Sequence, residues 1–395
     1  MSKLKNGNLL SVYIGQLISP TVEFASIPFL SFILTKNGMA INQAGTVVTV
    51  RSLLNLVGIL VGGRLLPHFK AKQTVITCAF INAGTYFVAA IPIPAVVALA
   101  LSINGLTLGL YYSFESELIL NSCSKSDQAH VYSIIRTLVN IGGAVGPLIA
   151  SVFSGFYGTT FFLLLGVVSL VYPMTLLTTY KVRNEVRNIQ DDKTQEPSTI
   201  AGTTIGEGKS FRAFSFLLIA LTIGTVSISA FGSVVPMLVN QRGGTPFSYT
   251  VGVWINTLGV VFCQIPLQSV LDKIGPKKST VAGLVLICFS MLPLSMVTHL
   301  FWFYFGTVLF TLGELFFSLN ASLLLLEYAE GRHAGEYLSL SKLRTYFASP
   351  IASAIGTFSV VRYGSIGYAL TFSIFVLTSI FLLLLIWKYN KTVAE

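Results

Sequence analysis

The sequence predicts an all-α membrane protein with twelve transmembrane helices in two pseudo-symmetric six-helix bundles. Three observations lead to this prediction: an apolar composition, a series of apolar runs long enough to cross a bilayer, and one polar stretch near the middle. Of the 395 residues, 53% are hydrophobic and 10% are charged. Because a water-exposed surface carries roughly 25% charged residues, the composition excludes an ordinary soluble protein.

A bilayer core about 30 Å thick requires roughly 20 apolar residues in each spanning helix. Six such runs precede the polar stretch, at 9–35, 44–66, 74–92, 95–119, 130–156 and 159–180. Six more follow it, at 213–240, 247–272, 280–298, 300–327, 336–361 and 365–388. The first run is too long for a signal peptide and no cleavage site of small residues closes it, so we expect it to remain a spanning helix.

The polar stretch divides the chain nearly in half. It predicts an N-terminal six-helix bundle over 1–180, a cytoplasmic linker over 181–212 and a C-terminal six-helix bundle over 213–395. The two halves also match at a constant offset of 205 residues, which places Lys72 over Lys277 and Tyr132 over Tyr337. Two separate loops that agree on one offset indicate duplicated halves, an arrangement known from membrane transporters.

The basic residues predict the orientation. If the N-terminus is cytoplasmic, most of the 25 lysines and arginines lie on the cytoplasmic side, and only Lys36, Arg242 and Arg362 lie on the opposite side. This is the positive-inside bias of membrane proteins. It accounts for the net charge of +10 without a nucleic-acid partner, and it predicts a multi-pass protein of the cell (inner) membrane with both termini in the cytoplasm.

The four cysteines and four histidines are scattered along the chain. No pair has the spacing of a zinc site, and no framework of paired cysteines is evident. We therefore expect no disulfide framework, no metal site and no cofactor.

Three segments resemble parts of a known family. Residues 142–147 (GGAVGP) look like the GxxxGP signature of antiporters, and residues 272–278 (DKIGPKK) look like the DRxGRK loop in its second-half position. Residues 332–343 (RHAGEYLSLSKL) are similar to a helix junction of multidrug-efflux proteins. The chain thus resembles the major facilitator superfamily, and within it the twelve-helix drug:proton antiporter branch with its MdtH-like efflux proteins.

The first-half loop departs from the family pattern. Pro67 and Lys70 stand where the family has an aspartate and a glycine, and Asn104 lies near the position of the family's helix-4 arginine. The resemblance implies that charge contacts of this loop govern the conformational switch. This chain is therefore expected to use other contacts, such as those of Asp272.

A charged side chain inside a membrane span costs about 3 kcal/mol on insertion scales. Five charged residues in the predicted spans therefore need an explanation: Glu23, Arg51, Glu115, Arg136 and Glu314. Arg344 lies near a helix end, so we expect its side chain to reach the membrane interface.

Glu23 forms a polar stripe with Gln16 and Ser19, since spacings of seven and four place these residues on one helix face. Glu23 and Arg51 fall at similar depth on adjacent helices and are expected to pair. The pair is either a permanent salt bridge that fixes packing, or a site where proton and substrate compete for the carboxylate. The resemblance implies that Glu23 faces a central cavity, and Pro28 is expected to kink the helix at a gate.

The other charged residues leave similar alternatives. Glu115 and Arg136 lie near the cytoplasmic ends of their helices, where an ion pair is expected to be structural or to act as a gate. Glu314 has no obvious cation at its depth. It is either a proton carrier and substrate ligand or a protonated glutamate tied to a neighbouring helix.

Further polar residues near these positions are candidates for substrate binding, because binding pockets are mostly apolar with a few placed polar groups. They are Asn104, Tyr111, Tyr112, Asn256, Gln264 and Asn320. Each is equally suited to join two helices by hydrogen bonds. Gly142, Gly146, Pro147 and Gly275 are expected to serve packing and gating, and the pairs Gly58/Gly62 and Gly105/Gly109 to allow close helix approach.

Together these expectations describe a secondary transporter that exports a drug, a siderophore or other metallophore, or a metabolite. Proton antiport through Glu23 and Glu314 is expected, by alternating access in a monomer. A proton-coupled uptake permease and a lipid flippase of the same fold are alternatives. A membrane-embedded enzyme or a receptor is a remote one, because the sequence has neither an intramembrane catalytic cluster nor a soluble ligand-binding domain.

Overall fold

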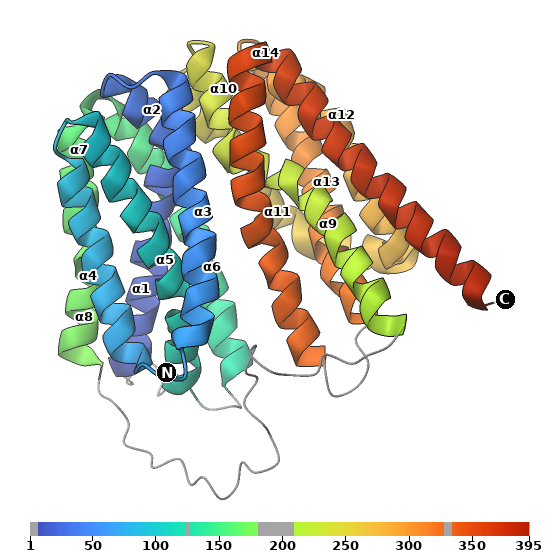
Figure 1. Cartoon of the computed structure of the whole chain (residues 1–395), viewed down its shortest axis with the longest axis horizontal. Helices are drawn as coiled ribbons and strands as arrows, with labels where there is room; N and C mark the ends of the chain where they lie inside the picture. The colour runs from blue at the N-terminus through green and yellow to red at the C-terminus, as the bar shows by residue number, and fades with distance from the viewer. Residues whose placement is uncertain (1–6, 124–126, 181–208, 328–333, 395) are drawn as a thin grey trace, which may run out of the picture. The chain divides into compact units, whose positions relative to one another are not determined.

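The structure, a computed structural model, describes residues 7–123, 127–180, 209–327 and 334–394. Helices account for most of these residues (Figure 1). In the first half they are α1 (Gly7–Ser26), η2 (Ile27–Phe29), α2 (Leu30–Lys36), α3 (Ile41–Leu65), α4 (Ala71–Ala89), α5 (Pro94–Ser122), α6 (Gln128–Val152), η3 (Phe153–Phe156), α7 (Thr159–Ser169) and α8 (Val171–Thr179). In the second half they are α9 (Lys209–Ser233), α10 (Val235–Gln241), α11 (Pro246–Ile274), α12 (Pro276–Ser295), α13 (Leu300–Glu327) and α14 (Ala334–Ala394). Most of the expected linker, residues 181–208, lies outside the described ranges.

Over those ranges, ten helical segments are long and apolar enough to cross a membrane. The last of them, Leu343–Lys388, has 46 residues. At 1.5 Å per residue it is about twice as long as the bilayer core is thick. The non-helical backbone of Gly364 (φ 61°, ψ −138°) breaks α14 into two spans at that point. With α14 counted as two spans and the more polar α4 added, the described helices account for the twelve predicted spans.

The offset of 205 residues also relates the boundaries of the helices. Three helices of the first half begin 205 residues before their counterparts, at Leu30 and Val235, Ile41 and Pro246, and Ala71 and Pro276. Helices α2 and α10 also end 205 residues apart. The glycines after them, Gly38 and Gly243, both have positive φ, at 85° and 76°. Such angles favour glycine because it has no Cβ.

Contacts between Cα atoms divide the chain into two compact units, which are described separately. Unit 1 comprises Met1–Glu23, Leu54–Gly143 and Thr159–Ile205. Unit 2 comprises Phe24–Leu53, Ala144–Gly158 and Gly206–Glu395.

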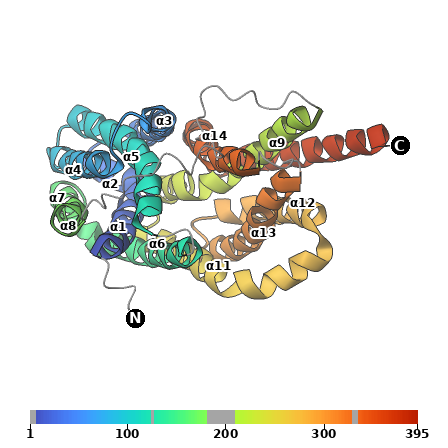
Figure 2. The same ribbon diagram turned by 90° about the horizontal axis from the view of Figure 1, so that it is seen from below.

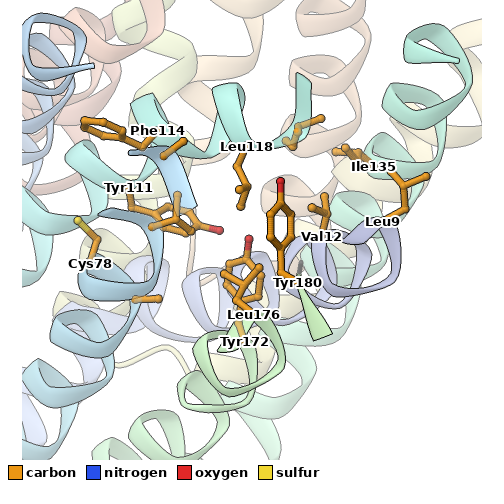
Figure 3. Close-up of a cluster of buried hydrophobic side chains, with 14 of the residues drawn as sticks. Leu9, Val12, Cys78, Tyr111, Phe114, Leu118, Ile135, Tyr172, Leu176 and Tyr180 are labelled. Carbon is orange, nitrogen blue, oxygen red and sulfur yellow. The ribbon is translucent and has the colours of Figure 1, made fainter. Parts of the chain in front are cut away.

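The core of unit 1 gathers residues of α1, α4, α5, α6 and α8 around three buried tyrosines (Figure 3). Tyr111 and Tyr172 meet edge to face, with ring centroids 6.1 Å apart, and the hydroxyl of Tyr180 lies 3.1 Å from Ser122 Oγ. Helices α3 and α5 touch through glycine. A Cβ on Gly109 would lie 2.1 Å from the backbone oxygen of Asn55, so the expected role of this glycine in close helix packing is confirmed.

In unit 2, α12 packs along α13, and α9 packs along α14 (Figure 2). Gly283 and Gly313 allow the first contact, because a Cβ on either would lie under 3.0 Å from the backbone of the other helix. The second is joined by buried hydroxyls: Ser227 donates to Phe372 O over 2.9 Å, and Ser379 donates to Ala220 O over 2.7 Å.

Unit 2 also contains contacts between first-half and second-half helices. Asn240 at the end of α10 donates to Ser31 O over 3.0 Å and to Thr35 Oγ1 over 2.9 Å, both on α2. Trp254 Nε1 of α11 donates to Ala144 O of α6 over 2.9 Å. These bonds join α2 to α10 and α6 to α11.

Candidate functional site

The polar stripe of α1 faces α5 within unit 1. Tyr112 Oη donates to both carboxylate oxygens of Glu23. Ser19 Oγ lies 3.4 Å from Tyr111 Oη, one residue earlier on α5. The expected stripe therefore meets two adjacent tyrosines, and the carboxyl of Glu23 has a neutral donor among its partners.

Glu115 forms a second carboxyl site on the same helix. It is 7% exposed, and it accepts hydrogen bonds from Tyr111 on its own helix and from Gln16 on α1. The side chain of Arg136 is exposed. The structure thus holds Glu115 by neutral donors rather than by the ion pair with Arg136 that the sequence suggests.

Asn82 and Thr85 of α4, which the sequence analysis did not select, complete this region. Asn104 Nδ2 donates to Thr85 Oγ1 over 3.0 Å and approaches Asn82 Oδ1 at 3.5 Å, so both partners lie on α4. Thr107 also donates to Asn82. Asn82 and Thr85 are three residues apart on one face of α4, and this spacing in an otherwise apolar run is the signal that would have found them.

A small cavity lies among these groups in unit 1. Its volume is about 40 Å³, and its lining includes Ser19, Glu23, Asn82, Asn104 and Tyr111. A water molecule needs about 10–15 Å³ of cavity volume and two to four polar partners. The cavity therefore has room for about three waters, but not for a drug-sized solute.

A larger cavity of about 310 Å³ lies in unit 2, lined by residues of α9, α11, α13 and α14. Glu314 lies on its wall. The carboxylate oxygen Oε2 of Glu314 accepts a hydrogen bond of 2.8 Å from Asn256 Nδ2, which also lies 3.2 Å from Thr311 Oγ1. Ligand pockets have volumes of about 300–1,000 Å³, so this cavity is large enough for a small organic molecule.

Arg344 lines the same cavity, and this corrects the expectation that its side chain reaches the membrane interface. The residue is 9% exposed. Its guanidinium carbon lies 5.3 Å from the ring centroid of Phe317, a distance typical of cation–π contact. In the part of the chain that the structure describes, Arg344 Nε and Nη1 have no hydrogen-bond partner. Glu314 thus shares its cavity with a cationic side chain, which the sequence did not reveal.

The remaining candidate binding residues are more dispersed. Arg51 is 4% exposed and belongs to unit 2, so its pairing with Glu23 of unit 1 stays a prediction. Asn320 is buried and donates to Phe316 O on its own helix over 2.9 Å. Gln264 is half-buried on α11.

The candidate gating residues fall at helix breaks and close contacts. Pro28 lies in η2, where the first spanning helix leaves α-helical geometry. A Cβ on Gly142 would lie 2.9 Å from the backbone nitrogen of Thr21, so α6 and α1 approach closely there. Pro147 O accepts a 3.1 Å hydrogen bond from Thr250 Oγ1 of α11.

The second-half loop is a tight turn at Gly275, which has φ 83° and precedes α12. The side chain of Asp272 lies outside the described residues, as do the start of the 332–343 segment and its side chains up to residue 342. Gly146 lies within α6.

Comparisons with known proteins bear on the family. The family model described as Major Facilitator Superfamily matches residues 12–340 and 217–394. The chain is 24% identical over 305 residues to the "Uncharacterized MFS-type transporter YqjV" of Bacillus subtilis (strain 168), which covers 74% of this chain and 72% of that protein. It is 21% identical over 330 residues to the "Multidrug resistance protein MdtH" of Yersinia pestis (strain Pestoides F), which covers 81% and 78%.

Solved structures show the same fold. A POT family transporter in complex with 5-aminolevulinic acid aligns with TM-score 0.77 at 14% identity, over 98% of this chain and 96% of its own. A mutant of the nucleoside transporter NupG aligns with TM-score 0.74 at 13% identity, over 96% and 99%. Since the family model covers most of the sequence and the helices form the same fold, the chain belongs to the major facilitator superfamily.

Proposed function

We propose that this secondary transporter exports a small organic compound in exchange for protons, and that Glu23 and Glu314 carry the proton. Membership of the superfamily already makes the protein a membrane transporter of a small molecule and not an enzyme. The direction of transport, the proton and the carriers are our proposal.

The observation that carries the proposal is the position of Glu314. Its carboxyl lies on the wall of a 310 Å³ cavity, inside a spanning helix, and Asn256 donates to it. An ionised carboxylate costs about 3 kcal/mol at the centre of a membrane helix, so the neutral form is favoured until a bound solute or cation compensates. A group that exchanges its proton when the cavity fills or empties couples the two movements.

Glu23, the second proposed proton carrier, lies beside a cavity that can hold water. It lines the cavity of about 40 Å³, in which the amide groups of Asn82 and Asn104 and the hydroxyl of Ser19 offer partners for water. Chains of such waters conduct protons without admitting the solute. In this proposal Glu23 serves proton movement, whereas Glu314 is shared by the proton and the solute.

The contacts between half-chains in unit 2 suggest the gate. With both termini cytoplasmic in a monomer of the inner membrane, α2 and α10 lie on the outer side. The bonds from Asn240 to α2 and from Trp254 to α6 then close the outer entrance. Alternating access would break these bonds, as the bundles at 1–180 and 213–395 rock about the site.

Export is favoured by the name of one relative, since the Yersinia protein is a multidrug resistance protein at 21% identity. Uptake, or transfer of a lipid between leaflets, remains the alternative within the same fold. The direction in which a solute gradient drives protons through the reconstituted protein distinguishes them.

The test uses the purified protein in proteoliposomes that hold a pH-sensitive dye. A panel of candidate solutes is added under an imposed pH gradient, and solute-dependent proton flux is recorded. We expect Glu314→Gln and Glu23→Gln to abolish proton-coupled accumulation while solute exchange without a gradient persists. Glu117→Gln on α5 is the matched control and should behave as wild type. If both variants accumulate solute at the wild-type rate under a pH gradient, the carrier assignment is wrong.

A further inference from the structure

We propose that Arg344 makes the cavity of unit 2 an oxyanion subsite, so that the transported solute is a small organic acid with an apolar or aromatic body. This inference rests on the proposed function only in taking that cavity as the solute site. It adds the chemical class of the solute, which neither the fold nor the relatives provide.

The first argument is the state of the guanidinium. Arg344 is nine-tenths buried, and its Nε and Nη1 groups find no acceptor among the residues that the structure places. A buried charge without a hydrogen-bonded partner is costly, so buried charges in proteins are normally paired. A ligand that brings an anionic acceptor removes this cost.

The second argument is that the nearest carboxyl of the cavity does not fill this role. Glu314 is bound by Asn256, and the structure shows no ion pair between Glu314 and Arg344. The two groups share one chamber without neutralising each other directly. The guanidinium charge of Arg344 therefore stays available to attract an anion.

The third argument is geometric. Guanidinium is a planar fork of N–H donors that matches a carboxylate or another oxyanion through two parallel hydrogen bonds. The ring centroid of Phe317 lies 5.3 Å from the guanidinium carbon, within the range of cation–π contact. A buried arginine that contacts an aromatic ring is better prepared to bind an oxyanion than a mobile one at a membrane surface.

The body of the solute follows from the rest of the wall. Phe231 and Phe310 stack with ring centroids 4.8 Å apart and planes 19° apart, and both line the cavity. A volume of about 310 Å³ is near the lower limit for ligand pockets. The cavity therefore suits one or two rings with a single acidic group.

The test compares two probes of equal size, indole-3-propionate and its neutral amide. Binding to the purified full-length protein in detergent is measured by calorimetry at a pH where the acid is ionised. We expect the acid to bind at least about tenfold more tightly than the amide. Because a hydrogen bond to a charged group contributes about 1.5–3 kcal/mol, Arg344→Gln should weaken binding of the acid by about 10- to 100-fold and leave binding of the amide unchanged.

Two further variants keep the result interpretable. Arg362→Gln removes an exposed arginine of the same helix and should leave both affinities as in wild type. Arg344→Lys keeps the charge but not the fork, and should retain part of the preference for the acid. Unchanged binding of the amide shows that a variant is folded. Equal affinity for acid and amide, including no binding of either at millimolar concentration, would overturn the proposal.

The binding assay contains no proton gradient, so its outcome is separate from that of the transport assay. If Glu314→Gln and Glu23→Gln transport normally, the proton carriers are misassigned even when the acid binds through Arg344. If the acid and the amide bind alike, the solute class is wrong even when both variants lose coupling.

Discussion

Replacing Asn240 by leucine should open the contact between α2 and α10. Leucine has a similar size but cannot donate, so the variant loses the bonds of 3.0 Å to Ser31 O and 2.9 Å to Thr35 Oγ1. A hydrogen bond contributes about 0.5–1.5 kcal/mol net in proteins and about 0.6 kcal/mol on average between membrane helices. Two bonds thus amount to about 1–2 kcal/mol, which changes a two-state ratio by a factor of about 5–30.

The population of the open state can be measured by alkylation of a cysteine at position 31. Ser31 is 3% exposed and its hydroxyl has no hydrogen-bond partner in the ranges that the structure covers, so Ser31→Cys removes no side-chain bond. The four native cysteines are first replaced. A membrane-impermeant maleimide then reacts with the new thiol at a rate proportional to the fraction of time that the contact is open.

We expect the Asn240→Leu variant to react about 5–30 times faster than its parent. The same substitution should have a smaller effect when Thr35→Val has already removed one of the two acceptors. Ser353→Ala, which removes a bond of 3.0 Å within a single helix, serves as control. An unchanged alkylation rate in Asn240→Leu would show that these bonds do not hold α2 and α10 together.

Two other predictions concern unit 1. Tyr112→Phe removes the hydroxyl that donates to Glu23. It should slow solute-driven proton flux about tenfold, because hydrogen bonds to charged groups contribute about 1.5–3 kcal/mol. No further loss is expected when Glu23→Gln is already present, and an additive loss would contradict this reasoning. Gly109→Ala places a Cβ 2.1 Å from Asn55 O. The resulting overpacking costs about 1–3 kcal/mol and should lower the melting temperature of the protein in detergent by several degrees. Gly84→Ala, with open space around its Cβ, is the control and should leave the melting temperature unchanged; equal melting temperatures of the two variants would argue against close packing of α3 and α5.

Hydropathy predicted the fold well because the length of a membrane span is set by the bilayer and not by contacts within the protein. The breaks inside spans were less predictable. Pro20 and Pro28 both lie in the first span, yet α1 continues through Pro20 and ends before η2, which contains Pro28. The corresponding break at Val234, before α10, was not expected, although Pro236 occupies the first turn of that helix. A proline permits a break, and neighbouring helices decide whether it occurs.

The candidate site was predictable along each helix but not between helices. Spacing alone placed Gln16, Ser19 and Glu23 on one face of α1, because that relation depends only on the helical repeat. The partner of Glu23 on α5 is Tyr112, which the sequence offered only as a candidate for substrate binding, while the pairing of Glu23 with Arg51 stays a prediction. Which side chain a stripe meets depends on the rotation and register of the next helix, and the composition of one helix contains no information on either.

The direction of the Arg344 side chain was also not predictable from its own helix. Near a helix end, a long basic side chain can extend toward water or back into the protein, and the free energy of the first choice is favourable in a single helix. The second choice requires a chamber, and that chamber exists only because α9, α11, α13 and α14 leave about 310 Å³ between them. Phe317 and Arg344 are 27 positions apart and lie on α13 and α14, yet their side chains are in cation–π contact. The position of this cation in the cavity therefore depends on how the four helices pack, and not on the sequence of one helix.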